Sequence, residues 1–195
     1  MTRIGLMAVL GLLVGTLGQA AAQTTKHDDK HESKIDDKQI SYNGDFSGSV
    51  LSTEIDTNGD GLRAVSFTIV GKTNLGRTDV HTILEFAPAG PGVCPNGNQG
   101  LLLTAIFGTG TIRFERRDGD MLFVRADPGL KACADQSTGQ QFVSGVLDFV
   151  GGTGDFDQAG GSIEVSSVTQ GLFQDPKGLL FGASSGQFEG TIVRF

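Results

Sequence analysis

The sequence contains no tryptophan, one tyrosine (Tyr42) and two cysteines among its 195 residues. A transmembrane β-barrel needs aromatic girdles and a continuous apolar outer band, and this chain lacks the Tyr and Trp for the girdles. The chain does end on a phenylalanine after an alternating segment, but only one face of residues 187–192 is apolar. The composition therefore favours a soluble protein over a transmembrane β-barrel.

Basic residues are also scarce and scattered. The chain has 15 Lys and Arg against 22 Asp and Glu, for a formal charge of −7, and no basic cluster. Binding to nucleic acid or to anionic lipid depends on such clusters. We therefore expect no nucleic-acid partner and instead a small molecule or a protein.

The sequence gives no serine, cysteine or histidine the setting of a catalytic nucleophile. The GxSxG spacing occurs as GASSG at 182–186, but it falls inside the alternating run 180–194 and not before a helical pattern, and His81 is the only histidine outside the N-terminal 40 residues. The loop GGTG at 151–154 lacks the GK[ST] of a phosphate-binding loop and opens no helical pattern. We expect no cofactor, and whether the protein is an enzyme stays open.

The N-terminus indicates export. Arg3 precedes a short apolar stretch, and Ala20 and Ala22 stand where a signal peptidase reads. We predict a signal peptide over 1–22, a disordered polar linker over 23–43 and one domain over 44–195. No membrane span is expected to remain after cleavage, so the protein is predicted to be secreted or periplasmic. In that oxidising compartment Cys94 and Cys133, which are too far apart for a CxxC motif, are predicted to form a stabilising disulfide.

From Tyr42 onward the pattern is typical of an all-β fold. The chain has thirty glycines, five prolines and no long apolar stripe of helical period. Alternating runs cover 45–55, 62–71, 77–87, 101–108, 110–116, 120–126, 140–150, 161–173 and 180–194, and the fourth and fifth can be one strand bent at Gly108 and Gly110. Asp118-Gly119 is a hairpin signal. We predict a single eight-stranded antiparallel up-and-down β-barrel, with a sandwich as the alternative.

The loop "GGTGDFDQAGG" places a phenylalanine among five glycines. Gly151, Gly152 and Gly154 allow a tight reversal between two strands, and Phe156 is expected to tuck beneath the turn as a plug at the barrel rim. The longer stretch "FVGGTGDFDQAGGSIEV" resembles the GGTGxFxxAxG stretch of the dirigent and allene oxide cyclase superfamily. "SSGQFEGTIV" and "EIDTNGDGLRAVSFTIVGKTNLGRTDVH" are similar to the last strand and first hairpin of its bacterial members.

This resemblance implies an eight-stranded barrel that holds a hydrophobic molecule, and commonly a homotrimer. Members close a fatty-acid epoxide into a cyclopentenone or steer the coupling of phenoxy radicals. Only the glycine-loop residues carry over by position. The superfamily's cavity acids, arginines and tyrosines have no assigned counterparts in this sequence.

The segment "DTNGDG" has the spacing that begins a calcium loop, with Asp56, Asn58 and Asp60 as ligands. The acid required at the twelfth position is replaced by Phe67. The favoured interpretation is a tight turn without metal.

Strand alternation separates polar from apolar faces. Asp79, His81 and Glu85 share one face of their strand, and the polar candidates continue on other strands with Arg113, Glu115 and Asp148. Pointing inward, His81, Glu85 and Arg113 would be weak candidates for proton transfer or oxyanion stabilisation. The outward orientation, a solvated surface, is favoured because buried charges are uncommon. Phe86, Phe114 and Phe149 are weak candidates for the wall of a ligand cavity.

Three functions follow from these patterns. The leading hypothesis is an exported barrel that binds a small hydrophobic molecule in its lumen without catalysis. The second is an isomerase, cyclase or dirigent activity, which predicts a polar pair inside. The third is a structural or surface-interaction protein with a filled core, acting through loops such as 88–100 and 127–139.

Overall fold

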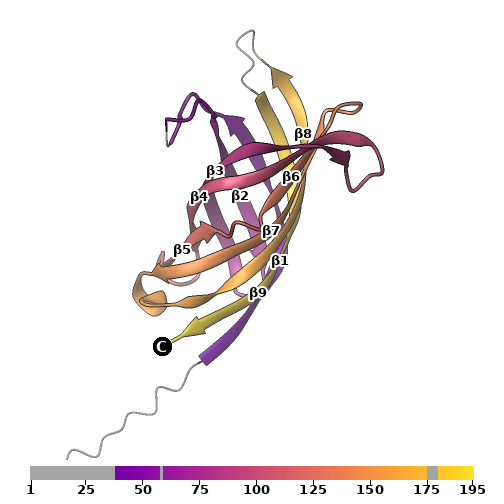
Figure 1. Ribbon diagram of the computed structural model, residues 1–195. Helices are drawn as coiled ribbons and strands as arrows, with labels where there is room; N and C mark the ends of the chain where they lie inside the picture. The colour runs from indigo at the N-terminus through magenta and orange to yellow at the C-terminus, as the bar shows by residue number, and fades with distance from the viewer. Residues whose placement is uncertain (1–37, 58, 175–179) are drawn as a thin grey trace, which may run out of the picture. The chain divides into compact units, whose positions relative to one another are not determined.

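The computed structural model describes residues 38–57, 59–174 and 180–195. Within them the chain forms nine strands and one short 3-10 turn (Figure 1). They are β1 Lys38–Ser52, β2 Ala64–Thr73, β3 Gly76–Val93, β4 Gln99–Phe114, β5 Met121–Ala126, β6 Lys131–Asp135, β7 Gln140–Gly152, η1 Gly154–Phe156, β8 Gly160–Gln174 and β9 Leu180–Arg194. The predicted signal peptide and most of the predicted linker lie outside the described residues.

The strands close into a ring in which all paired neighbours are antiparallel. Their order is β3-β2-β1-β9-β8-β7-β5-β4, and a β3–β4 pairing joins the two ends. The short strands β5 and β6 share one position, because each pairs with both β4 and β7. The ring therefore has eight positions, which confirms the predicted all-β class and the eight antiparallel strands.

The two ends of the ring carry different connections. We call the end with the C-terminus, the turns at 74–75 and 115–120 and the loop 153–159 the lower end. The upper end carries the connections 53–63, 94–98 and 136–139 (Figure 1). At the lower end Asp118 and Gly119 have φ of 49° and 83°, and the N–H of Asp120 donates to the carbonyl of Arg117 at 2.8 Å. These two residues form a turn within the six-residue connection 115–120, and the predicted hairpin between β4 and β5 is confirmed.

Several strand boundaries differ from the prediction. The fourth and fifth runs form one strand, β4, as the glycines suggested. The regions 88–100 and 127–139 were expected to be loops, yet β3 continues to Val93 and β6 occupies 131–135. The added part of β3 contains Pro88 and Pro91. They are tolerated because β3 pairs with β2 only as far as Glu85, which leaves one edge of its last segment without a β2 partner.

Strand β1 begins at Lys38, inside the stretch expected to be a disordered linker. Lys38 pairs with Arg194 and Ile40 with Ile192, so the first residues of β1 match the last residues of β9. The segment has few apolar side chains, but backbone pairing to β9 does not depend on them. Because the prediction relied on hydrophobicity, it placed the start of the domain at residue 44, several residues after the first strand begins.

The core is the inside of the ring. Alternate side chains from all the strands point inward and are buried, as the period-two pattern requires. The lower half is filled largely by aromatic rings: Tyr42, Phe46, Phe114, Phe149, Phe156 and Phe188. The remainder of the interior is mostly aliphatic.

Candidate functional site

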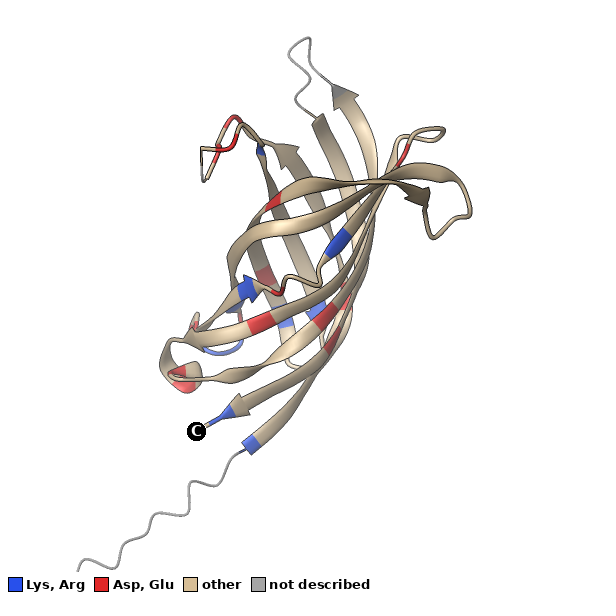
Figure 2. Ribbon diagram, in the orientation of Figure 1, with Lys and Arg blue, Asp and Glu red and all other residues tan. Residues whose placement is uncertain are grey.

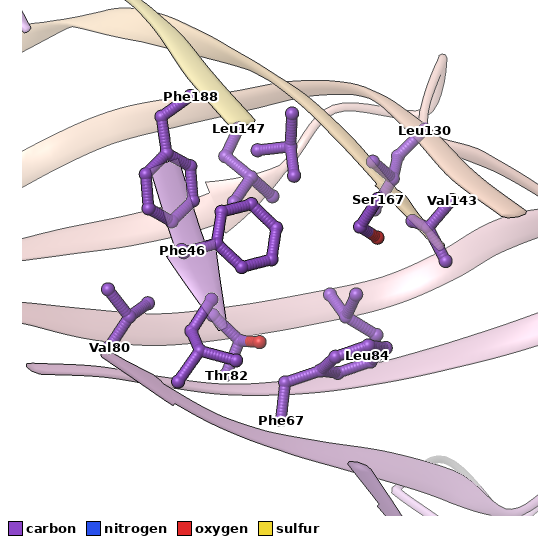
Figure 3. Close-up of a pocket in the computed structure, with 12 residues that line it drawn as sticks. Phe46, Phe67, Val80, Thr82, Leu84, Leu130, Val143, Leu147, Ser167 and Phe188 are labelled. Atoms are coloured by element: carbon purple, nitrogen blue, oxygen red, sulfur yellow. The ribbon is translucent and has the colours of Figure 1, made fainter. Parts of the chain in front are cut away.

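The orientation of β3 decides which predicted face is internal. Val80, Thr82 and Leu84 are buried and line the interior, whereas His81 is exposed. In Figure 3 these three side chains lie with Phe67 of β2 around one small space. The apolar face of β3 is therefore the lumenal face.

The predicted polar constellation is not assembled inside the ring. His81, Arg113 and Glu115 are exposed, and Asp148 is half-buried. Asp148 lies 4.0 Å from Arg125, and Glu115 lies 4.0 Å from Arg77, both as surface ion pairs. Such pairs contribute little to stability. In the described part of the chain, none of these four charged side chains therefore lies in the interior.

Glu85 is the exception among these residues, since it is fully buried. Glu85 pairs with Phe107 of β4, and a register shift follows between Glu85 and Phe86. By alternation Glu85 lies on the same side of β3 as His81, away from the lumen. The connection between β1 and β2 covers it, and Glu85 Oε2 accepts hydrogen bonds from the backbone N–H and the hydroxyl of Thr57.

The phenylalanines proposed as cavity walls occupy different places. Phe114 and Phe149 are buried in the aromatic cluster of the lower half, each with an edge-on contact to Tyr42. Phe86 is partly buried and packs against the core. Phe46, Phe67 and Phe188, rather than these three, line the cavity described next.

The interior contains a cavity of about 40 Å³ (Figure 3). Its lining is apolar except for Thr82 and Ser167. The lining residues are Phe46, Phe67, Ile69, Val80, Thr82, Leu84, Leu130, Val143, Leu147, Val165, Ser167 and Phe188. A cavity that binds benzene measures roughly 150 Å³, so this space holds a few water-sized groups and no drug-sized ligand.

Two buried hydroxyls lie on the lumenal side of β8 and β9 without hydrogen-bond partners. They are Thr169 Oγ1 and Ser184 Oγ, and the two residues face each other in the β8–β9 register. Ser167, two residues before Thr169, lines the cavity. In the sequence, the hydroxyls of Ser167 and Thr169 alternate with Ser166 and Val168 in "SSVT", and this pattern was not predicted to be lumenal.

The only tyrosine of the chain lies in the aromatic cluster. Tyr42 stacks on Phe188 with ring centroids 6.0 Å apart, and its hydroxyl lies 3.4 Å from that of Thr78. Burial raises the pKa of the Tyr42 hydroxyl to about 12, and the hydrogen bond to Thr78 opposes this shift.

The glycine loop has the predicted form. Gly151 and Gly154 have φ of 118° and 56°, and a Cβ on Gly152 would lie 2.3 Å from the carbonyl oxygen of Met121. Phe156 is fully buried against Phe114. Above its ring lies Arg117, which also pairs with Asp155 at 2.9 Å.

The upper end is stapled by the predicted disulfide between Cys94 and Cys133, with Cα atoms 5.5 Å apart. Next to it Asp135 accepts side-chain hydrogen bonds from Asn98, Thr138, Ser137 and Asn96. These bonds, led by the one from Asn98, hold the pKa of the Asp135 carboxyl far below its usual range, although burial opposes them. The network ties the loops 94–98 and 136–139 together.

The predicted calcium ligands Asp56 and Asp60 lie in the connection between β1 and β2, whose acidic residues are red at the upper end in Figure 2. Asn58 lies outside the described residues. The structure brings Asp56 and Asp60 close to Glu85. No local sequence pattern links these residues, because Glu85 is in a different strand, β3.

The chain matches no known protein family and no curated protein sequence. Among the residues described, no helix has the length and apolar character needed to cross a membrane.

Proposed function

We propose that this protein is an exported, non-catalytic interaction module in which a filled ring of strands supports the connections at its upper end. The packing of the interior is the observation that carries this proposal. Large side chains occupy it and leave about 40 Å³, too little for a hydrophobic metabolite. The loops joined through Cys94–Cys133 and Asp135 then become the surface on which function is expected.

Export is part of this proposal. A disulfide persists in oxidising compartments, so the Cys94–Cys133 bond supports a secreted or periplasmic location. We further propose that the ring is an up-and-down barrel of the dirigent and allene oxide cyclase type. The buried phenylalanine in a loop with three positive-φ glycines supports that relationship.

Two measurements test the filled interior. Native mass spectrometry of the mature protein from its own host, followed by denaturing extraction, is expected to show a chain lacking two hydrogens and no bound small molecule. A reproducible hydrophobic species released at one per chain would overturn the proposal.

A variant extends this test. Phe188→Ala removes a ring that lines the cavity, and we expect a loss of about 3–5 kcal/mol in the free energy of unfolding. The variant is also expected to bind benzene, detected by NMR, whereas the wild type does not. Phe107→Ala is the matched control because this side chain is 40% exposed. Benzene binding to the wild type would contradict a filled interior.

A second candidate function, binding of one small molecule in the lumen, is favoured by the two hydroxyls without partners. A buried hydroxyl left unpaired is costly, and a ligand's polar group would satisfy Thr169 and Ser184. Thr169→Val and Ser184→Ala distinguish the two functions. If the interior holds only the core, both substitutions leave stability unchanged or raise it. If the hydroxyls bind a ligand, both variants lose the species that the wild type releases. The exposed Ser166→Ala on the same strand is the control.

A further inference from the structure

Hydrogen bonds hold the connection between β1 and β2 against the first residue of β2 and against Glu85 of β3. The backbone N–H of Thr53 donates to the carbonyl of Ala64 at 2.9 Å, and the N–H of Ala64 donates to that of Ile55 at 2.8 Å. The segment with calcium-loop spacing, "DTNGDG" at 56–61, follows directly after Ile55. It brings the carboxylates of Asp56 and Asp60 to the same place as Glu85 of β3.

Glu85 is the observation that requires an explanation. The residue is fully buried, and its Oε2 accepts two hydrogen bonds from Thr57. Its other oxygen, Oε1, is buried without any hydrogen-bond partner. Within the described part of the chain no Lys or Arg forms an ion pair with it. A buried carboxylate oxygen without a partner is costly, so a missing cation would account for it.

The three acidic residues converge on one point. One carboxylate oxygen each from Asp56, Asp60 and Glu85 lies within 4.8 Å of the others. Calcium binds oxygen at 2.3–2.6 Å, so opposite ligands of one ion are about 4.6–5.2 Å apart. We propose that Asp56, Asp60 and Glu85 bind a single Ca²⁺ ion that joins the β1–β2 connection to β3.

The ligand chemistry selects calcium among common metals. All three groups are hard carboxylate oxygens, without the imidazole or thiolate that zinc and copper favour. Mg²⁺ requires a tighter octahedron with distances near 2.0–2.1 Å and releases its water reluctantly. Three carboxylates in a partly buried site also supply the negative charge that a Ca²⁺ ion needs.

The same geometry explains why the calcium motif looked incomplete in the sequence. A continuous calcium loop places a bidentate acid at its twelfth position, where this chain has Phe67. Phe67 belongs to β2 and points into the interior. The acid comes instead from β3, because Glu85 pairs with Ala64 at the end of the connection.

Calorimetric titration of the chelator-treated mature protein with CaCl₂ tests the proposal. We expect one ion per chain and a rise in the melting temperature with calcium. Glu85→Gln is expected to weaken binding by at least about tenfold, because it removes one ligand charge and keeps the shape. Asp79→Asn, on the outer side of the same strand and 3.9 Å from Arg77, is the control and is expected to bind like the wild type.

Asp60→Asn provides an independent variant if Glu85→Gln does not fold, and the same loss is expected. The proposal is overturned if millimolar calcium gives neither heat nor a change in melting temperature. It is also overturned if either ligand variant binds calcium like the wild type. Equal stabilisation by MgCl₂ at the same concentration would overturn the assignment to calcium.

Discussion

The ring of Phe156 lies against that of Phe114, with centroids 4.7 Å apart and both side chains fully buried. A loop rich in glycine thus inserts an aromatic ring into the lower end of the β-ring. The glycines allow the chain to turn tightly. Burial of the Phe156 side chain offsets part of the conformational entropy that the glycine loop loses on folding. This arrangement explains why a phenylalanine stands in the middle of the glycine loop.

Phe156→Ala is expected to lower the free energy of unfolding by about 3–5 kcal/mol, because it leaves a cavity against Phe114. Urea unfolding followed by far-ultraviolet circular dichroism measures the change. Phe195→Ala, at a side chain 65% exposed, should change stability by less than about 0.5 kcal/mol. Equal effects of the two substitutions would contradict the plug.

Gly152→Ala is expected to destabilise the protein by about 1–3 kcal/mol, since its Cβ would lie 2.3 Å from the Met121 carbonyl oxygen. Gly160→Ala, at the other end of the same loop, is the control because its Cβ would have no neighbour closer than 3.5 Å. Thermal unfolding of the two variants measures the difference. A Gly152→Ala protein as stable as the Gly160→Ala protein would show that the close approach is absent in solution.

Tyr42 is expected to ionise near pH 12, well above a free tyrosine at about 10. Because the folded pKa is raised, the unfolded chain loses this proton first. The stabilising contribution is complete below about pH 10 and is lost as the pH rises toward 12. Tyrosinate absorbance reports this residue alone, as the chain has one tyrosine and no tryptophan. A midpoint near 10 in the folded protein would show that the hydroxyl is exposed.

Asp135 is expected to make stability sensitive to acid. Its folded pKa is far below the value of about 3.9 in an unfolded chain, so its contribution is present above pH 4 and declines as the pH falls below it. Asp135→Asn should lower the melting temperature at neutral pH and flatten its dependence on pH below 4. Asp157→Asn, which removes one charge at an exposed position, serves as the control. An unchanged acid profile in Asp135→Asn would refute the role of this network.

The double substitution Cys94→Ala and Cys133→Ala opens a loop with a sequence separation of 39 residues. The chain-entropy estimate predicts a loss of about 3–4 kcal/mol in stability. Chemical unfolding of the variant beside the reduced and oxidised wild type measures it. Stability equal to that of the oxidised wild type would mean that the Asp135 network alone holds these loops.

The strand pattern was predictable where local chemistry decides it. Alternating apolar residues correctly predicted most of β2, β4, β5, β7 and β9. The Asp118-Gly119 pair correctly predicted the hairpin between β4 and β5. The first residues of β1 and the whole of β6 were missed. The first four residues of β1 include one apolar side chain, and β6 is only five residues long. Both are held by pairing with other strands. A local pattern has no information about such partners.

The sequence by itself determined the all-β class, the alternation of most strands and the pairing of its only two cysteines, because these depend on composition and neighbouring residues. Only the tertiary structure decided that Val80 and Leu84 face inward and that aromatic rings fill the lumen. It alone placed Glu85 beside Asp56 and Asp60. The physical reason is that closing the ring sets the register between distant strands, and register decides which side chains meet.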